Sequence, residues 1–265
     1  MRVVIVHGRA AEMEIPALME ADWREAFWFG QQRVGSALTP ETVDVRLAFY
    51  GDLWRPDQHQ PLPVIETGAA VEELAGLNEI SLLFDRLGIG DALLEHILHD
   101  VDDFFDVVNL RALVNQRLAD AVLTDQDPDG TIVVGFSMGS LVAYDALRSN
   151  PTLPVGALFT IGSPLCMPSF YKRLVAIGQT PFPTQLQLWV NVWTKDDPAA
   201  AGHNDFPARF PNAAPGGARV QDLETWGRGA SPTNPAGAHN ALDYLSSRVF
   251  ASAIQQAVEA MGNGV

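Results

Sequence analysis

The sequence predicts an α/β protein with a mostly parallel central β-sheet and helices on both faces. Short apolar runs rich in β-branched residues, typical of strands buried on both faces, alternate along the chain with segments of helical periodicity. The chain has 265 residues, of which 47% are hydrophobic and 18% are charged. This length and composition fit one globular domain over residues 1–265, with residues 51–103 as a helical lid or cap insertion.

The first predicted elements are a strand, a helix and a second strand. Residues 2–6 form a β-branched apolar run that ends in His7-Gly8, as a buried parallel strand ends in a turn. Residues 16–38 have loosely helical apolar positions, and Pro40 follows them. Residues 42–50 alternate apolar and polar side chains, which predicts a strand near a sheet edge.

The insertion begins with a proline-containing loop and continues through leucine-rich and acidic segments interrupted by glycines. We expect its large apolar side chains to pack on the core, or else to line an acyl pocket under a lid. These side chains are Trp54, Leu82, Phe84, Leu93, Leu94 and Phe104. A long helix, with a cap at Asp91, is predicted to lead to residue 123 with its apolar face at positions 104, 108, 113, 118 and 122.

The second half of the chain continues the alternation of strands and helices. The predicted strands are residues 131–134, 156–161, 186–193 and 218–220, and the predicted helices are residues 139–148 and 242–261. Such an alternation favours a parallel sheet, because each helix returns the chain to the edge at which the next strand begins.

Charge, cysteine content and hydropathy disfavour several classes of partner and location. The chain has 17 Lys and Arg against 32 Asp and Glu, a net charge of −15, so we expect no nucleic-acid partner. Cys166 is the only cysteine, which excludes an intrachain disulfide and a cysteine-rich metal site. No apolar stretch approaches the ~20 residues that cross a bilayer, and no secretory signal precedes the first strand. We therefore expect a cytoplasmic protein without an integral membrane segment.

The strongest chemical motif is Gly135-Phe136-Ser137-Met138-Gly139, which follows a predicted strand and precedes a predicted helix. Small residues on both sides of the serine permit a strained turn that raises its hydroxyl above the sheet. A serine hydroxyl becomes a useful nucleophile only when a base takes its proton and donors stabilise the oxyanion. The motif therefore predicts Ser137 as a nucleophile. A second serine, in Gly162-Ser163-Pro164, fits a plain turn better.

With this elbow, the chain resembles the α/β-hydrolase superfamily over nearly all of its length. That family places its residues in the order nucleophile, acid, histidine. The resemblance implies that the acid lies in Asp196-Asp197-Pro198, directly after the predicted strand 186–193. We favour Asp197, which precedes the proline, and keep Asp196 as the alternative.

The same resemblance points to the base and to the oxyanion donors. Of the six histidines, His239 follows the candidate acid, lies in a Gly- and Pro-rich loop and precedes the final helix, whereas His203 is its nearest rival. In the family, one oxyanion donor is the backbone amide after the nucleophile and the other comes from an early loop. In this chain they would be the amides of Met138 and Arg9.

The predicted activity is hydrolysis of a carboxylic ester through an acyl-enzyme on Ser137, in the manner of a serine esterase or lipase-like enzyme. The substrate would be a small molecule with an apolar acyl group. A thioesterase or amidase with the same residues, and a non-catalytic hydrolase-fold binding protein, are the alternatives. No metal-binding helix, phosphate-binding loop or dinucleotide fingerprint is present in the sequence, so we expect no cofactor and no metal. The oligomeric state stays open.

Overall fold

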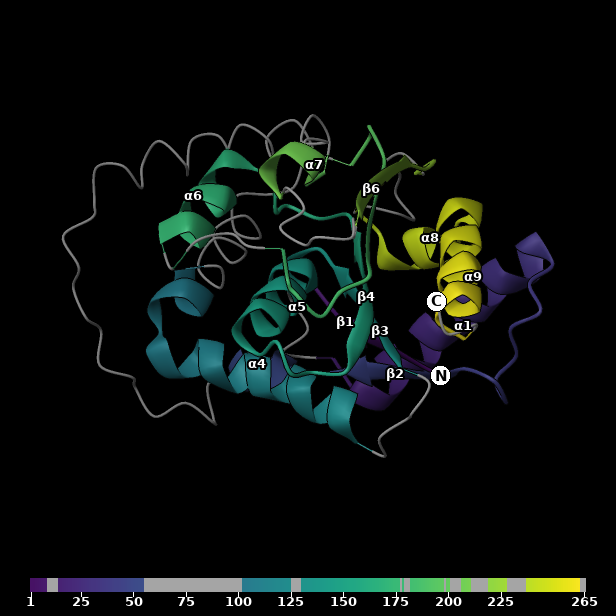
Figure 1. Cartoon of the computed structure of the whole chain (residues 1–265), viewed down its shortest axis with the longest axis horizontal. Helices are drawn as coiled ribbons and strands as arrows, with labels where there is room; N and C mark the ends of the chain where they lie inside the picture. Colours follow the sequence, from purple (N-terminus) through teal and green to yellow (C-terminus); the bar gives the residue numbers. More distant parts are fainter. Residues whose placement is uncertain are drawn as a thin grey trace.

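A parallel β-sheet forms the centre of the molecule (Figure 1). Its strands are β1 (Arg2–Val6), β2 (Asp44–Ala48), β3 (Thr131–Phe136), β4 (Val155–Ile161), β5 (Leu188–Trp193) and β6 (Arg219–Glu224). The helices are α1 (Pro16–Val34), the 3₁₀ helix η1 (Gly51–Trp54), α4 (Val108–Leu123), α5 (Met138–Ser149), α6 (Pro168–Ala176), α7 (Phe206–Arg209), α8 (Ala241–Leu245) and α9 (Arg248–Gly262). This computed structural model describes residues 1–8, 14–54, 102–124, 130–176, 178, 182–197, 199–200, 206–210, 219–227 and 237–262.

The described strands form one six-stranded sheet in the order β2-β1-β3-β4-β5-β6, and each neighbouring pair is parallel. The chain moves outward from β1 to β2, then returns to the other side of β1 and adds β3 to β6 in sequence. The strand order therefore reverses between β1 and β3. In open α/β sheets, ligands bind outside the carboxyl ends of the strands at this reversal, so the topology alone marks the ends of β1 and β3.

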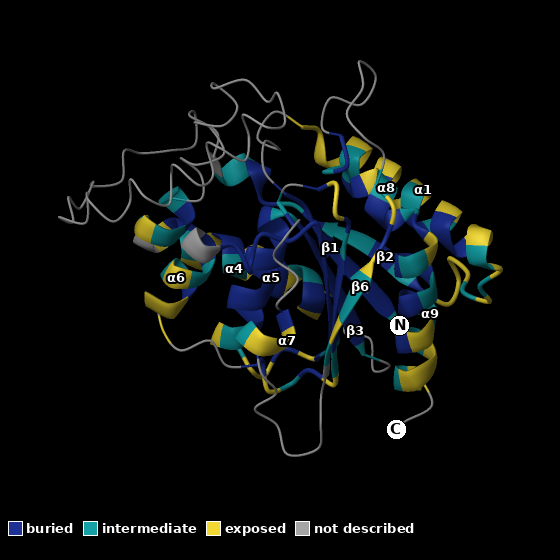
Figure 2. Ribbon diagram, turned by 90° about the horizontal axis from the view of Figure 1, so that it is seen from above, coloured by how far each residue is buried: buried dark blue, intermediate teal, exposed yellow. Residues whose placement is uncertain are grey.

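Two apolar cores cover the two faces of the sheet, because successive side chains of a strand point to opposite faces. Val4 and Val6 pack in the core that α4, α5, α6 and α7 cover. Val3 and Ile5 pack in the core that α1, α8 and α9 cover. Figure 2 shows the buried sheet between these helices. The outer surfaces of α1, α6 and α9 are exposed, whereas α5 is buried along almost its whole length. The predicted fold class, a parallel sheet with helices on both faces, is confirmed.

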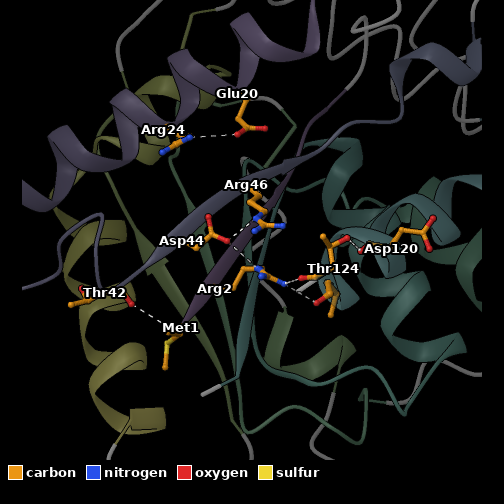
Figure 3. A network of polar contacts seen from close by, with 10 residues as sticks. Met1, Arg2, Glu20, Arg24, Thr42, Asp44, Arg46, Asp120 and Thr124 are labelled. Carbon is orange, nitrogen blue, oxygen red and sulfur yellow. Dashed lines mark hydrogen bonds and ion pairs between the residues drawn. The ribbon is translucent and has the colours of Figure 1, made fainter. Parts of the chain in front are cut away.

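A buried arginine stabilises the edge of the sheet at which the strands begin (Figure 3). The opposite edge, at which the strands end, is the carboxyl edge. Arg2 is the first residue of β1 and is 3% exposed. Its guanidinium donates to the Asp44 carboxylate at 3.3 Å, to the Val122 carbonyl at 3.2 Å and to the Thr124 carbonyl. A buried charge is stable only when it is paired and hydrogen-bonded. These contacts tie β1 to the start of β2 and to the end of α4.

The first helix is shorter than the sequence predicts. It ends at Val34, four residues before the predicted end at residue 38. Gly35 takes a left-handed conformation with φ 65°, and its amide donates to the carbonyls of Gln31 and Gln32. A glycine in this conformation satisfies the last carbonyls of a helix and turns the chain away from its axis.

The closing helix is two helices, α8 and α9, and not the single helix predicted over residues 242–261. The side chain of Ser247 accepts a hydrogen bond from the amide of Phe250 at 3.2 Å. A serine that accepts from an amide three residues ahead acts as an N-cap, so it starts a new helix. The short helices α6 and α7, of nine and four residues, were not predicted, because so few turns give little room for a helical repeat of apolar residues.

The apolar face of α4 also differs from the prediction. Leu113, placed on that face from the sequence, is 52% exposed. The buried residues recur every fourth position instead, at Leu110, Val114, Leu118 and Val122. This spacing keeps a stripe on one side of a helix with 3.6 residues per turn.

Most of the predicted insertion at residues 51–103 lies outside the described residues, and so do the start of the predicted long helix at Asp91 and most of the candidate acyl-pocket side chains. At its beginning, the 3₁₀ helix η1 follows β2, which is an edge strand as predicted. Phe104 is fully buried and belongs to the core beside α4 and α5. For this side chain, packing is the observed role. Among the described helices, none is long and apolar enough to span a bilayer.

Candidate active site

Ser137 occupies a strained turn between β3 and α5. Its φ is 53° and its ψ is −125°, and it is the only non-glycine residue with positive φ in the described part of the chain. Such a conformation costs of order 1–3 kcal/mol and persists only where the surroundings enforce it. Strain of this kind at the carboxyl end of a central strand is typical of a functional residue.

The glycines on either side of Ser137 are required by close backbone contacts. A Cβ on Gly135 would lie 2.5 Å from the Cα of Ser140. A Cβ on Gly139 would lie 2.3 Å from the carbonyl oxygen of Val6. Because only a residue without a side chain fits either position, α5 can start directly against β1 and β3.

Two hydrogen-bonded serine hydroxyl groups support the backbone of this turn. The Oγ of Ser140 donates to the carbonyl of Ser137 at 2.5 Å and lies 2.6 Å from the Oγ of Ser163. The Oγ of Ser163 also accepts from the amide of Leu165 at 3.3 Å. Since Ser140 donates to the carbonyl, Ser163 donates to Ser140. Ser163, in the turn Gly162-Ser163-Pro164, therefore supports the backbone of Ser137 through Ser140.

His239 lies against the hydroxyl of Ser137. Its Nε2 is 3.0 Å from the Oγ of Ser137, which is within hydrogen-bonding distance. One face of the imidazole stacks on Phe136, with ring centroids 4.8 Å apart and an interplanar angle of 29°. The side chain is 24% exposed, so one edge remains open to solvent. The ring is thus held in place but can be reached from outside.

Asp197 lies on the other side of the same imidazole. The Nδ1 of His239 is 3.0 Å from each carboxylate oxygen of Asp197, and Asp197 is fully buried. The neighbouring Asp196 is exposed to solvent. Of the two candidate acids, Asp197 is therefore the one that contacts the histidine.

Two further donors, which no sequence motif marks, stabilise the Asp197 carboxylate. The hydroxyl of Tyr244 donates to Oδ2 at 2.7 Å, and the amide of Ala199 donates to Oδ1 at 2.8 Å. A Cβ on Gly162 would lie 2.9 Å from Oδ2 and 3.0 Å from the ring of Tyr244. The glycine at the end of β4 therefore leaves room for both groups. In the sequence, Tyr244 reads as one more apolar position of the closing helix.

The electrostatic setting of His239 favours its protonated form. Burial of the imidazole opposes the charge, but the charge of Asp197 and its hydrogen bond outweigh burial and raise the pKa of His239 above the ordinary value. An imidazole with a raised pKa is a better proton acceptor once it is neutral. The three groups can therefore move a proton from the hydroxyl of Ser137 to the ring.

The amide of Met138, one of the two expected oxyanion donors, lies at the start of α5. Met138 is the first residue of α5, and the first amides of a helix have no acceptor within it. Arg9, the second expected donor, lies outside the described residues, but the adjacent Gly8 packs against the elbow. A Cβ on Gly8 would lie 3.0 Å from the Cβ of Ser137.

His7 is a buried residue of the turn that follows β1, and its ring makes structural contacts. It is 1% exposed and its ring stacks on Tyr50 with centroids 3.9 Å apart. Its Nε2 accepts from the amide of Tyr50 at 3.0 Å, so its Nδ1 donates to the carbonyl of Gly8 at 2.6 Å. His203, the rival base, lies outside the described residues. Across the described ranges, no three His, Cys, Asp or Glu side chains are grouped to hold a metal ion.

No family model matches the sequence, and no curated protein matches it. Among solved structures, one match is a protein from Xanthomonas campestris pv. campestris that is described as a hydrolase of the α/β superfamily. The two chains are 17% identical with a TM-score of 0.44, and the match covers 96% of this chain and 98% of that chain. A second is an IroE-like serine hydrolase from Shewanella oneidensis, with 14% identity, a TM-score of 0.45, and 97% and 70% covered. A third is a SOBER1 variant from Arabidopsis thaliana, with 12% identity, a TM-score of 0.42, and 98% and 99% covered. Identities and TM-scores this low do not assign a reaction to this chain.

Proposed function

We propose that this chain is a serine hydrolase that cleaves a carboxylic ester through an acyl-enzyme on Ser137. The observation that carries the proposal is the continuous line of contacts from the Oγ of Ser137 through His239 to Asp197, each 3.0 Å long. These side chains come from three loops at the carboxyl edge of the sheet. Nucleophile, base and orienting acid in contact are the geometric signature of nucleophilic acyl transfer.

In the first half-reaction, the Oγ of Ser137 attacks the carbonyl carbon of the ester while the Nε2 of His239 takes the hydroxyl proton. The carboxylate of Asp197 stabilises the imidazolium that forms and keeps Nδ1 protonated, so that Nε2 is free to accept. His239 then gives the proton to the departing alkoxide oxygen. An alcohol leaves, and the acyl group remains on Ser137.

In the second half-reaction, a water molecule takes the place of the alcohol. His239 removes one of its protons as the water oxygen attacks the acyl carbon. The tetrahedral intermediate collapses, and His239 returns a proton to the Oγ of Ser137. The acid product leaves, and the site is restored without any cofactor in these steps.

Both tetrahedral intermediates carry a negative oxygen beside the amino end of α5. The amide of Met138 and the positive end of the helix dipole favour negative charge there. The strained backbone of Ser137 brings the hydroxyl close to this end. Attack and charge stabilisation therefore take place at one point.

A panel of p-nitrophenyl esters with short and medium acyl chains tests the proposal. We expect turnover of at least one ester, and a fall in kcat of at least about a thousandfold in Ser137→Ala. Ser149→Ala is the matched control, and it should retain most of the activity because Ser149 is exposed at the far end of α5 from Ser137. A thioester and an anilide in the same panel separate the neighbouring substrate classes.

Two results would contradict the proposal. One is the absence of turnover for every member of the panel by a folded protein. The other is turnover that persists in Ser137→Ala, since no other described serine contacts a histidine in this arrangement. The first result would favour a binding protein with this fold.

A further inference from the structure

Tyr244 is placed where it can act on the site without touching the substrate. It lies in α8, is 2% exposed and donates its hydroxyl to the Oδ2 of Asp197 at 2.7 Å. The short helix begins directly after His239 and Asn240, whose side chain accepts from the amide of Leu242 at 2.9 Å. This cap fixes the helix, so one segment of chain contacts Asp197 twice, through the imidazole and through the phenol.

The hydroxyl of Tyr244 stabilises the buried carboxylate of Asp197. A buried carboxylate needs donors for its oxygens, and without them its charged form is strongly disfavoured. The oxygens of Asp197 are shared among His239, Tyr244 and the amide of Ala199. The amide and the phenol hold the two oxygens from different sides. The carboxylate is thereby kept facing Nδ1 of the histidine.

Asp197 is the neighbour that controls the charge of the His239 imidazole. Within the described ranges, Asp197 faces Nδ1, the hydroxyl of Ser137 faces Nε2, and the ring of Phe136 covers one face. Tyr244 stands behind the carboxylate and keeps its proton, because burial and the charge of Asp197 both raise the pKa of Tyr244 far above the ordinary range. The phenol is therefore a permanent hydrogen-bond donor to the carboxylate.

We propose that Tyr244 is a positioning residue of this site, which holds the carboxylate of Asp197 toward His239 and limits the negative charge that the imidazole experiences. This inference rests on the proposed function. Loss of the hydroxyl has two consequences. The carboxylate gains freedom to shift while it stays paired with Nδ1, which loosens the orientation of the imidazole, and its unshared charge binds the proton of His239 more tightly.

The test is Tyr244→Phe, which keeps the buried ring and removes the oxygen. We expect kcat to fall about tenfold, the equivalent of ~1.4 kcal/mol, while KM stays within about twofold. The acid limb of the kcat/KM profile should move to higher pH. The matched control is Tyr171→Phe in α6, which removes a hydroxyl that donates to the carbonyl of Arg209 at 3.4 Å. The control should leave both quantities at their wild-type values.

A double-mutant cycle with Asp197→Ala separates positioning from packing. If Tyr244 acts through the carboxylate, Tyr244→Phe should have no further effect on kcat when the carboxylate is absent. An equal tenfold loss in both backgrounds would overturn the inference. So would wild-type kcat and an unmoved acid limb in the single variant.

Two measurements do not depend on turnover. NMR titration of the His239 imidazole should show a higher pKa in Tyr244→Phe than in the wild type and no change in Tyr171→Phe. Replacing all four tyrosines with 3-fluorotyrosine, which keeps every hydroxyl but makes it a stronger donor, should lower the pKa of His239. An unchanged pKa in both samples refutes the positioning role. If these shifts appear but no ester is cleaved, the proposed function fails and the positioning role stands.

Discussion

Converting Asp197 to asparagine should lower kcat by about 10³ to 10⁴-fold, equivalent to ~4–5.5 kcal/mol, while the fold is retained. The carboxylate is fully buried and accepts from His239, Tyr244 and Ala199 on two oxygens. An amide has one oxygen and one NH₂ group, so it cannot accept from donors on both sides. If its oxygen pairs with the phenol or the amide, its NH₂ meets Nδ1 of His239.

The consequence is a change of tautomer at the imidazole. An NH₂ group beside Nδ1 requires that nitrogen to accept, which moves the ring proton to Nε2. The Nε2 of His239 then donates toward Ser137 and can no longer take its proton. Ground-state binding is unaffected, so the loss should appear in kcat and not in KM.

The assay is ester hydrolysis at a pH on the plateau of the wild-type profile, with Asp196→Asn as the control. This adjacent carboxylate is exposed and makes no contact with His239 among the described interactions. The control should retain kcat within about twofold. A fall of less than tenfold in Asp197→Asn, or an equal fall in Asp196→Asn, would refute the orienting role of Asp197.

Four further predictions concern the titration of His239 and the packing of the fold. The kcat/KM value should rise with pH as His239 loses its proton, with a midpoint above the ordinary pKa of about 6.5 that moves to lower pH in Asp197→Asn. Gly139→Ala, whose Cβ would meet a carbonyl at 2.3 Å, should lower the free energy of unfolding in urea by about 3 kcal/mol. Gly35→Ala, with open space but a φ of 65°, should cost only about 1–2 kcal/mol. Ser163→Ala should destabilise the fold by about 1–3 kcal/mol in the same assay, with equal loss at every pH tested, because it removes a buried hydrogen bond between neutral groups.

The sheet was predictable because buried parallel strands carry a strong local signal. Residues 2–6 and 131–134 are runs of β-branched side chains, and they coincide with β1 and the first part of β3. Helix ends were harder to predict. The left-handed turn at Gly35 and the cap at Ser247 are single-residue features inside stretches that otherwise read as helix.

The chemical groups were predictable to the extent that they lie in motifs. Ser137 stands in a glycine-flanked elbow, and the order of the chain pointed to Asp197 and His239. Tyr244 could not be found in this way, because an aromatic residue in an amphipathic helix has the same pattern whether its hydroxyl meets solvent or a buried carboxylate. Its role depends on a contact across 47 residues that only the folded chain brings together.

Covalent labelling with a fluorophosphonate, read by intact mass and peptide mapping, tests most directly whether Ser137 is an activated nucleophile. We predict one label per chain on Ser137, with a rate lower by at least about a thousandfold in His239→Ala. A folded protein that stays unlabelled, that carries the label on Ser163, or that reacts equally fast without the imidazole of His239 would contradict the proposal.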